Sequence, residues 1–239
     1  GGRSSARETI ARVVAGAIAK QILSEQGIDV KAWTAQVGSI ACERDWTRLN
    51  LKQIDSSPVR CPDLSVAQQM EELILRVKGE GDTIGGIIAG VITGCPAGLG
   101  EPVFDKLDAE LAKAALSIGA VKGIEFGAGF AAADSTGIVN NDDMRAEGGS
   151  ARFLTNNAGG ILGGISTGNN IVFRLAVKPV PSIFKSQKTV CKENGSYADR
   201  DLEIKGRHDV CLCPRIVPVV EAMTSIVLAD MLLRNRSSR

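Results

Sequence analysis

Apolar residues recur every three or four positions in four segments of the chain, and this spacing predicts amphipathic helices. Glu221 and Asp230 interrupt the most apolar of these segments, which favours a buried helix over a membrane span. Ser5 and Glu8, at the start of the first segment, are typical of a capping box: the serine accepts the third amide of the helix, and the glutamate reaches back to the cap. The predicted helices cover residues 5–27, 65–78, 105–118 and 217–233.

Shorter apolar runs between the predicted helices are typical of strands. Strands are predicted over residues 84–93, 121–126 and 171–177. The pair Asn194-Gly195 favours a two-residue turn, which predicts a hairpin over residues 189–204. Residues 134–157 are polar and weakly patterned, so we expect a mobile excursion there. Helices and strands alternate without a repeat period, which predicts a single α+β domain over residues 1–239.

The amino-acid composition argues against some classes of binding partner. The 239 residues carry 28 basic and 27 acidic side chains, a formal charge of 28 − 27 = +1. Nucleic-acid binders commonly carry a basic excess, and 6 Phe, 2 Trp and 1 Tyr give few rings for stacking bases. We therefore expect neither a nucleic acid nor a membrane as partner. Glycine is abundant, with 27 residues in 239, about 11% against an average of about 7%.

Six cysteines are thinly spread over a chain too long to need disulfide bonds for stability. This usage predicts reduced thiols and a cytoplasmic location. No signal or transit peptide is recognised, and a plastid location stays open if a transit peptide preceded Gly1. Cys211 and Cys213 follow His208 but lack a fourth ligand at zinc spacing, so we interpret them as packing thiols and expect no metal.

The first candidate site is the segment of residues 1–7, which leads into the first predicted helix. Unpaired amides and the positive end of the helix dipole favour an anion there. Arg3 and Arg7 add fixed positive charge, and Ser4 and Ser5 add hydroxyl donors. The segment is therefore either a cradle for phosphate or carboxylate groups, or an ordinary capped helix with two solvated arginines.

Residues 156–168 hold two glycine pairs, Gly159-Gly160 and Gly163-Gly164, separated by two apolar residues. This spacing suits a backbone that lies flat against a ligand or another chain. The segment matches neither the dinucleotide fingerprint nor the Walker loop. Taken alone, it is interpreted as a tight-packing turn.

Two further segments combine charge with a constrained backbone. Arg207 and Asp209 flank the chain's only histidine, His208, and offer an anion anchor beside a proton acceptor. Lys178 ends a predicted strand and is followed within residues 178–182 by two prolines, which withhold amides from a sheet. Segments of the second kind commonly form sheet edges and sometimes line sites.

Seven motifs, in this order, resemble the chorismate synthase family over essentially the whole chain. Each motif alone is unspecific, whereas seven in a shared order are specific. They are residues 1–9 (GGRSSARET), 81–86 (GDTIGG), 96–107 (PAGLGEPVFDKL), 120–127 (AVKGIEFG), the paired-glycine stretch 158–168, Lys178-Pro179 and residues 206–209 (GRHD).

The resemblance implies a β-α-β sandwich, here incomplete at the N-terminus, and a homotetramer with FMN near subunit contacts. It implies an anti-1,4 elimination that converts 5-enolpyruvylshikimate 3-phosphate to chorismate and phosphate, the last step of the shikimate pathway, which leads to the aromatic amino acids. Reduced FMN (FMNH2) donates an electron transiently, phosphate leaves, and a ring hydrogen is removed without net oxidation. Some members reduce their own flavin with NADPH, and others depend on an external reductase.

The resemblance also implies roles for individual residues. Arg7 and Arg207 bind the substrate, and Asp209 is the catalytic residue that assists proton transfer at the flavin. Gly119 stands where many members have Asn, and Val210 where Pro is usual. The positions implied to contact FMN are Arg3, Ser4, Ser5, Gly119, Ala120, Gly163, Lys178, Pro179, Val180, Pro181, Ser182 and Arg207.

The chain departs from the family in lacking two acid/base histidines of an N-terminal region, because His208 is its only histidine. We therefore expect much of a flavin site without the full proton-transfer machinery, each lost group costing about 10²–10⁴ in rate. Two alternatives stay open. One is a catalytically incomplete FMN- or phosphate-binding fragment of this family, and the other is an unrelated nucleotide-binding module with convergent glycine loops.

Overall fold

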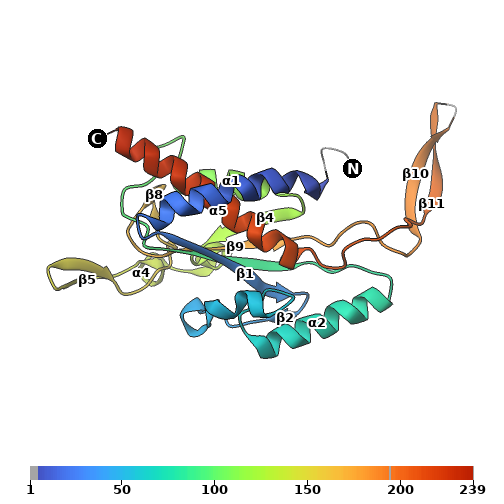
Figure 1. Ribbon diagram of the computed structural model, residues 1–239, viewed down its shortest axis with the longest axis horizontal. Coiled ribbons are helices and arrows are strands. Elements are labelled where there is room, and N and C mark those ends of the chain that lie inside the picture. The colour runs from blue at the N-terminus through green and yellow to red at the C-terminus, as the bar shows by residue number, and fades with distance from the viewer. Residues whose placement is uncertain (1–4, 194, 239) are drawn as a thin grey trace. The chain divides into compact units, whose positions relative to one another are not determined.

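In the computed structural model, which describes residues 5–193 and 195–238, five strands form the main sheet. Their order is β2-β1-β3-β9-β4 (Figure 1). β1 pairs with β2 in antiparallel register, with Val37 opposite Ile40. The strands cover Asp29–Val37 (β1), Ile40–Ala41 (β2), Gly86–Thr93 (β3), Val121–Phe126 (β4) and Ile171–Val177 (β9).

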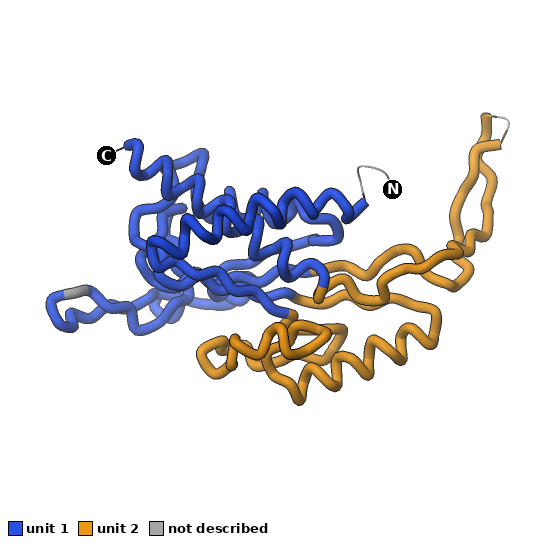
Figure 2. The backbone as a smooth tube through the Cα atoms, viewed as in Figure 1, with its two compact units in different colours: residues 1–33, 88–176, 215–239 blue, residues 34–87, 177–214 orange. Residues whose placement is uncertain are grey.

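The backbone divides into two units (Figure 2). Unit 1 consists of residues 1–33, 88–176 and 215–239, and unit 2 of residues 34–87 and 177–214. β1 and β3 each contribute residues to both units. This division matters for the candidate site, because the predicted site residues are distributed over both units.

Small residues form the contact between two helices of unit 1. A Cβ atom on Gly16 of α1 would lie 2.3 Å from the Cβ atom of Ala222 on α5, so only glycine allows this close approach. The buried face of α1 therefore contains Gly16, and its apolar stripe is exposed. That stripe consists of Ile10, Val13, Val14 and Ile18. The helices of unit 1 are α1 (Thr9–Ser24), α3 (Leu107–Leu116), α4 (Gly137–Asn140) and most of α5 (Cys213–Ser237).

A carboxylate on α5 connects α1 to the main sheet. Glu221 accepts a hydrogen bond from Lys20 Nζ and another, at 2.9 Å, from the backbone amide of Ala32. By length and composition α5 is apolar enough to cross a membrane, but 61% of its most apolar window is buried within the structure. Because it carries this paired carboxylate and is mostly covered, we interpret α5 as a core helix of unit 1, in agreement with the sequence analysis.

The expected excursion over residues 134–157 contains regular structure. Besides α4 it holds a hairpin of β5 (Met144–Glu147) and β6 (Ser150–Phe153). Asp142 accepts hydrogen bonds from the Thr155 hydroxyl and from the amides of Asn157 and Ala158, at 2.6 to 2.8 Å. These bonds tie the segment to the start of the paired-glycine stretch.

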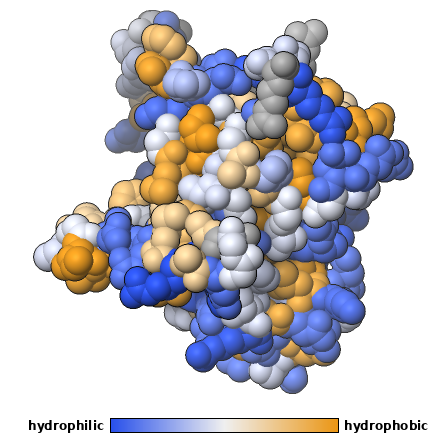
Figure 3. All heavy atoms as spheres, turned by 90° about the vertical axis from the view of Figure 1, so that its left-hand side faces the viewer, coloured by the Kyte–Doolittle hydropathy of each residue, from blue (hydrophilic) through white to orange (hydrophobic). Residues whose placement is uncertain are grey.

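The surface of unit 1, which also contains several short elements, carries large apolar side chains. Phe104 is 89% exposed and Phe130 is 81% exposed. Figure 3 shows in orange the apolar side chains that reach the surface on one face of the molecule. The short elements are η2 (Ala6–Glu8), η5 (Gly129–Asp134), β7 (Ile161–Leu162) and β8 (Ile165–Ser166).

Unit 2 contains helix α2 (Leu64–Gly79), two 3₁₀ segments and a hairpin. Asp63 caps α2 by accepting hydrogen bonds from the amides of Ser65 and Val66. The Cys211 and Cys213 thiols are buried and hydrogen-bond each other. The other elements are η3 (Trp46–Arg48), η4 (Leu51–Ser56), β10 (Gln187–Glu193) and β11 (Ser196–Leu202).

Most predicted elements are confirmed. β4 and β9 coincide with the strands predicted over residues 121–126 and 171–177, and β10 and β11 form the predicted hairpin. The final helix begins at Cys213, four residues before its predicted start. The pattern of apolar and polar residues did not predict β1, which is buried along most of its length.

Candidate functional site

Ser5 and Arg7, two predicted site residues, contact each other at the start of unit 1. Ser5 is the N-cap of the 3₁₀ turn η2, which leads into α1. Its hydroxyl accepts hydrogen bonds from the Arg7 amide at 3.5 Å and from Arg7 Nε at 3.2 Å. The two remaining predicted residues of this segment, Arg3 and Ser4, lie outside the described residues.

Arg12 links this segment to the end of α3. The predicted capping box is wrong in detail, because Ser5 accepts the second amide of the turn and Glu8 accepts Arg12 Nε at 2.8 Å instead of reaching back. The Arg12 guanidinium also donates to Ser117 Oγ at 2.6 Å and to the Ser117 carbonyl oxygen at 3.4 Å. Ser117 is the C-cap of α3. The start of α1 is therefore tied to the end of α3 that precedes Gly119.

Gly119 and Ala120 form the turn between α3 and β4, and they combine open space with backbone strain. A Cβ atom at Gly119 would meet nothing within 4 Å, so a ligand can approach the backbone there. Ala120 has a φ of 73°, a left-handed conformation that costs a non-glycine residue about 1–3 kcal/mol. Such strain is common at binding sites, where the surrounding structure imposes it.

Gly163 lies at the tip of the β7–β8 hairpin, away from Gly119. Gly163 and Gly164 have φ values of 60° and 86°, as a two-residue hairpin turn of this kind requires. A Cβ atom at Gly163 would meet nothing within 4 Å, whereas Gly164 is buried and its carbonyl oxygen accepts the amide of Leu107 at 2.8 Å. Leu107 begins α3. Gly163 and Gly119 therefore lie at opposite ends of a helix about 15 Å long.

In unit 2, residues 81–86 hold two predicted site segments together. The Thr83 hydroxyl donates to the carbonyl oxygen of Val180 at 2.6 Å. The next amide, that of Ile84, donates to the carbonyl oxygen of Val210 at 2.9 Å. One segment thus bonds both to the lysine–proline stretch and to the residue that directly follows the motif of Arg207 and Asp209.

Two further contacts fix the lysine–proline stretch. A Cβ atom on Gly85 would lie 2.5 Å from the Val177 carbonyl oxygen and 3.0 Å from Pro179 Cδ, so the two backbones touch. Asp82 accepts a hydrogen bond from Lys185 Nζ at 2.7 Å. That bond, together with a backbone amide, lowers the pKa of Asp82 below its usual value, so the carboxylate stays charged.

The His208 side chain contacts an aromatic ring, and one of its ring nitrogens is buried. Its ring lies against that of Phe184, with the centroids 5.9 Å apart. Its Nε2 atom is buried and has no hydrogen-bond partner among the described residues. Because buried polar atoms in proteins nearly always have a partner, this nitrogen is suited to a polar atom of a ligand.

Three cations of the predicted set are exposed and lack an acidic partner among residues 5–193 and 195–238. They are Arg7 in unit 1 and Lys178 and Arg207 in unit 2. Unpaired guanidinium and ammonium groups attract phosphate and carboxylate. With the exposed carboxylate of Asp209 two residues beyond Arg207, unit 2 can bind an anion and accept a proton.

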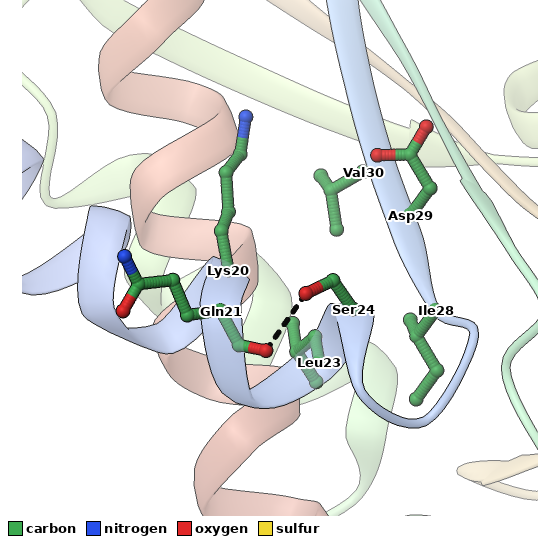
Figure 4. A pocket seen from close by; sticks show the side chains of 7 residues that line it. All are labelled: Lys20, Gln21, Leu23, Ser24, Ile28, Asp29 and Val30. Carbon is green, nitrogen blue, oxygen red and sulfur yellow. Dashed lines mark hydrogen bonds between the residues drawn. The ribbon is translucent and has the colours of Figure 1, made fainter.

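A cavity of about 250 Å³ in unit 1 lies apart from these residues (Figure 4). It opens between the C-terminal half of α1 and the start of β1, and no predicted site residue lines it. Its ammonium group, Lys20 Nζ, is paired with Glu221. The lining residues are Lys20, Gln21, Leu23, Ser24, Ile28, Asp29 and Val30. The candidate site is therefore assigned to the exposed segments and not to this cavity.

The two units divide the predicted residues between them. Ser5, Arg7, Gly119, Ala120 and Gly163 belong to unit 1. Lys178, Pro179, Val180, Pro181, Ser182, Arg207 and Asp209 belong to unit 2. Within the part of the chain that the structure describes, no three His, Cys, Asp or Glu side chains are grouped to hold a metal ion.

Two residues that organise the site, Arg12 and Thr83, were not assigned a role from the sequence. Thr83 lies within the motif of residues 81–86, but its hydrogen-bond partner Val180 is 97 positions away along the chain. The partner of Arg12, Ser117, is 105 positions away. Local spacing carries no signal for contacts of this range.

Comparison with known proteins gives one consistent result. The family model of chorismate synthase matches residues 1–233. The chain is 50% identical, over 239 residues, to the chorismate synthase of Phocaeicola vulgatus, and 52% identical, over 235 residues, to that of Methanosarcina barkeri. These alignments cover 100% and 98% of this chain, which spans 66% and 64% of the two relatives.

A solved crystal structure of chorismate synthase is also similar, with a TM-score of 0.80 and 31% sequence identity. The match covers 97% of this chain and 65% of that one. The described residues therefore have the α+β fold of that structure, as the sequence predicted.

Proposed function

Because this chain belongs to the chorismate synthase family, we propose that it acts in the conversion of 5-enolpyruvylshikimate 3-phosphate to chorismate and inorganic phosphate. In this elimination a C–O bond breaks toward phosphate, a C–H bond breaks, and a ring double bond forms, so nothing is oxidised overall. A carbon–oxygen lyase of this kind would supply the aromatic amino-acid pathway.

The observation that carries the proposal is the junction at residues 81–86. Through Thr83 and Ile84 this segment bonds to two segments that each present an exposed cation, Lys178 and Arg207, without an acidic partner in the described part of the chain. The substrate carries a phosphate and two carboxylates, and such groups need fixed positive charge and open donors. In the proposed function Arg7 and Arg207 bind the substrate.

FMN in its reduced form is the proposed cofactor, and the residues present suit it. Open backbone at Gly119 and Gly163, the exposed Lys178 ammonium and the buried His208 Nε2, which has no hydrogen-bond partner among the described residues, leave polar groups for a flavin and its phosphate. When bound, reduced FMN supplies an electron to the substrate and takes it back. The residues proposed to hold it are Arg3, Ser4, Ser5, Gly119, Ala120, Gly163, Lys178, Pro179, Val180, Pro181, Ser182 and Arg207.

The length of α3 supports a proposed homo-oligomer, a tetramer by family. Gly119 and Gly163 lie at opposite ends of this helix, so a single flavin meets both sets of contacts most easily where two copies adjoin. NADPH is a further proposed ligand if the protein reduces its own flavin. In the proposed reaction Asp209 accepts and returns a proton at the flavin.

The test combines flavin binding with turnover. FMN is titrated against the chain with and without 5-enolpyruvylshikimate 3-phosphate, and chorismate and phosphate are then measured anaerobically with reduced FMN. Arg7→Ala should weaken substrate binding about 10- to 100-fold, the worth of a charged hydrogen bond. The exposed Arg145 of unit 1 provides the control, since Arg145→Ala should leave binding unchanged. Tight ATP binding without any flavin signal would reject the proposal.

A second candidate function is binding without turnover. It is favoured by the single histidine of the chain, whose Nε2 is buried beside Phe184. In that case the chain binds FMN or phosphate through the same residues, but produces no chorismate. Turnover that Asp209→Ala slows about 10²-fold or more would exclude this candidate.

A further inference from the structure

One face of the β10–β11 hairpin in unit 2 is uncovered (Figure 1). Because successive residues of a strand point to opposite faces, the register of the hairpin defines this charged face. It consists of Lys188, Val190 and Lys192 on β10 and of Tyr197, Asp199 and Asp201 on β11. All six are exposed, Tyr197 by 75% and Val190 by 55%. The opposite face holds the half-buried residues Gln187, Cys191 and Ala198.

The charges on this face are sorted by strand. Both lysines lie on β10 and both aspartates on β11. Lys188 pairs with Asp201 across the strands at 2.7 Å, but Lys192 and Asp199 have no ion-pair partner in the described part of the chain. A hairpin with neither face covered is only marginally stable in water, which indicates that this face is covered in the working protein.

Symmetry identifies an occupant that fits. If two copies of the charged face meet about a two-fold axis parallel to the strands, β10 of each copy lies opposite β11 of the other. Lys188 then faces Asp201 of the other copy, and Lys192 faces the ring of Tyr197, a favourable cation–π contact. An axis across the strands would instead place β10 on β10 and oppose like charges.

We propose that the charged face packs against the same face of a second copy of this chain. This inference rests on the proposed homo-oligomer and identifies one of its contacts. The face is self-complementary, whereas a wholly basic or acidic partner would find as many repulsive as attractive groups on it.

Charge reversal tests the proposal in solution, without substrate or FMN. An acidic variant carries Lys188→Glu and Lys192→Glu, and a basic variant carries Asp199→Lys and Asp201→Lys. Each alone should associate at least 100-fold more weakly than the unchanged chain of 25.1 kDa, because the two strands that face each other across the contact then carry charge of the same sign. An equimolar mixture should recover the mass of the unchanged assembly. Gln187→Glu with Thr189→Glu, on the opposite face, is the matched control.

A cross-link keeps the proposal falsifiable if the reversed hairpins fail to fold. Val190 and Asp199 oppose each other within one hairpin, so the two-fold arrangement places Val190 of one copy against Asp199 of the other. With Cys191→Ser as background, a mixture of Val190→Cys and Asp199→Cys chains should form a disulfide-linked heterodimer on mild oxidation. The remaining five cysteines are buried.

The outcomes are distinct. Unchanged mass in both reversed variants, no recovery on mixing, or no heterodimer would overturn the charged face as a contact while the oligomer proposal stands. A monomeric unchanged chain would overturn both. The flavin titration tests different residues, and it measures separately whether the chain binds FMN.

Discussion

The two glycine-rich segments of the candidate site need glycine for different physical reasons. In residues 81–86, Gly85 and Gly86 have ordinary backbone angles but no room for a side chain. A Cβ atom on Gly86 would lie 2.1 Å from the carbonyl oxygen of Gln36. At the β7–β8 turn the reverse holds, because Gly163 has open space around it but a φ of 60°.

The comparison shows that a pair of glycines in the sequence can be required for either of two structural reasons. One pair allows backbones to touch, and the other allows a backbone conformation that L residues avoid. A side chain at Gly86 fails through steric overlap with fixed atoms, whereas a side chain at Gly163 causes only a modest backbone strain. The two kinds therefore differ in how much a single methyl group should cost.

Gly86→Ala should have the largest effect. Its methyl group would overlap the Gln36 carbonyl oxygen and lie 2.9 Å from Cys213 Sγ, with no flexible group to move aside on the backbone side. We expect a loss of about 3 kcal/mol or more in the free energy of unfolding, measured by urea denaturation. Gly79→Ala is the control, because a Cβ atom there meets nothing within 4 Å and the residue ends α2. A loss below 1 kcal/mol for Gly86→Ala would show that unit 2 is less tightly packed than described.

Asp142 should have an intermediate and pH-dependent effect, since it anchors the paired-glycine segment. Burial alone would raise its pKa, but the hydrogen bonds from Thr155, Ala158 and Asn157 outweigh burial and lower it. Asp142→Asn should cost about 1–3 kcal/mol near pH 7, because an amide replaces a charged acceptor of three hydrogen bonds.

The sign of the pH dependence follows from the lowered pKa. The stability that ionised Asp142 contributes is fully present above the unfolded value of about 3.9 and is lost as pH falls through the lower folded pKa. The stability difference between the unchanged chain and Asp142→Asn should therefore be constant from pH 7 to about pH 5, and shrink below pH 4. A difference that persists at pH 2 would place the effect in packing instead of charge.

Local patterns predicted the elements whose signals are local. β4 and β9 match their predicted bounds because each is a short apolar run between turn residues, and the Asn-Gly pair located the β10–β11 hairpin. β1 was not predicted because polar residues such as Thr34 are buried along it. Its sequence therefore lacks the alternation of apolar and polar residues that marks a half-exposed strand. On α1 the helix was predictable but its buried face was not, because Gly16 fits Ala222 and hydrophobicity does not encode that fit.

The candidate site, too, was predictable from the sequence only in part. Arg7, Lys178 and Arg207 could be selected from the sequence, because their charge and flanking residues mark them, and the family resemblance added Gly119 and Gly163. The contacts that hold site segments within each unit could not be predicted, because the bonds of Arg12 to Ser117 in unit 1 and of Thr83 to Val180 in unit 2 join distant parts of the chain.

The smallest stability effect, and the sharpest test of the glycine comparison, is expected at Gly163. The β5–β6 turn provides a matched control, since Gly148 has a φ of 57° and a Cβ atom there also meets nothing within 4 Å. Gly163→Ala and Gly148→Ala should each cost about 1 kcal/mol, the price of a left-handed alanine. If the flavin lies against the backbone of Gly163, only Gly163→Ala should also weaken FMN binding, by about 10-fold in a fluorescence titration. Equal FMN affinity in the two variants would leave Gly163 as a turn residue alone, and loss of affinity in both would trace the effect to stability, because Gly148 belongs to no predicted site.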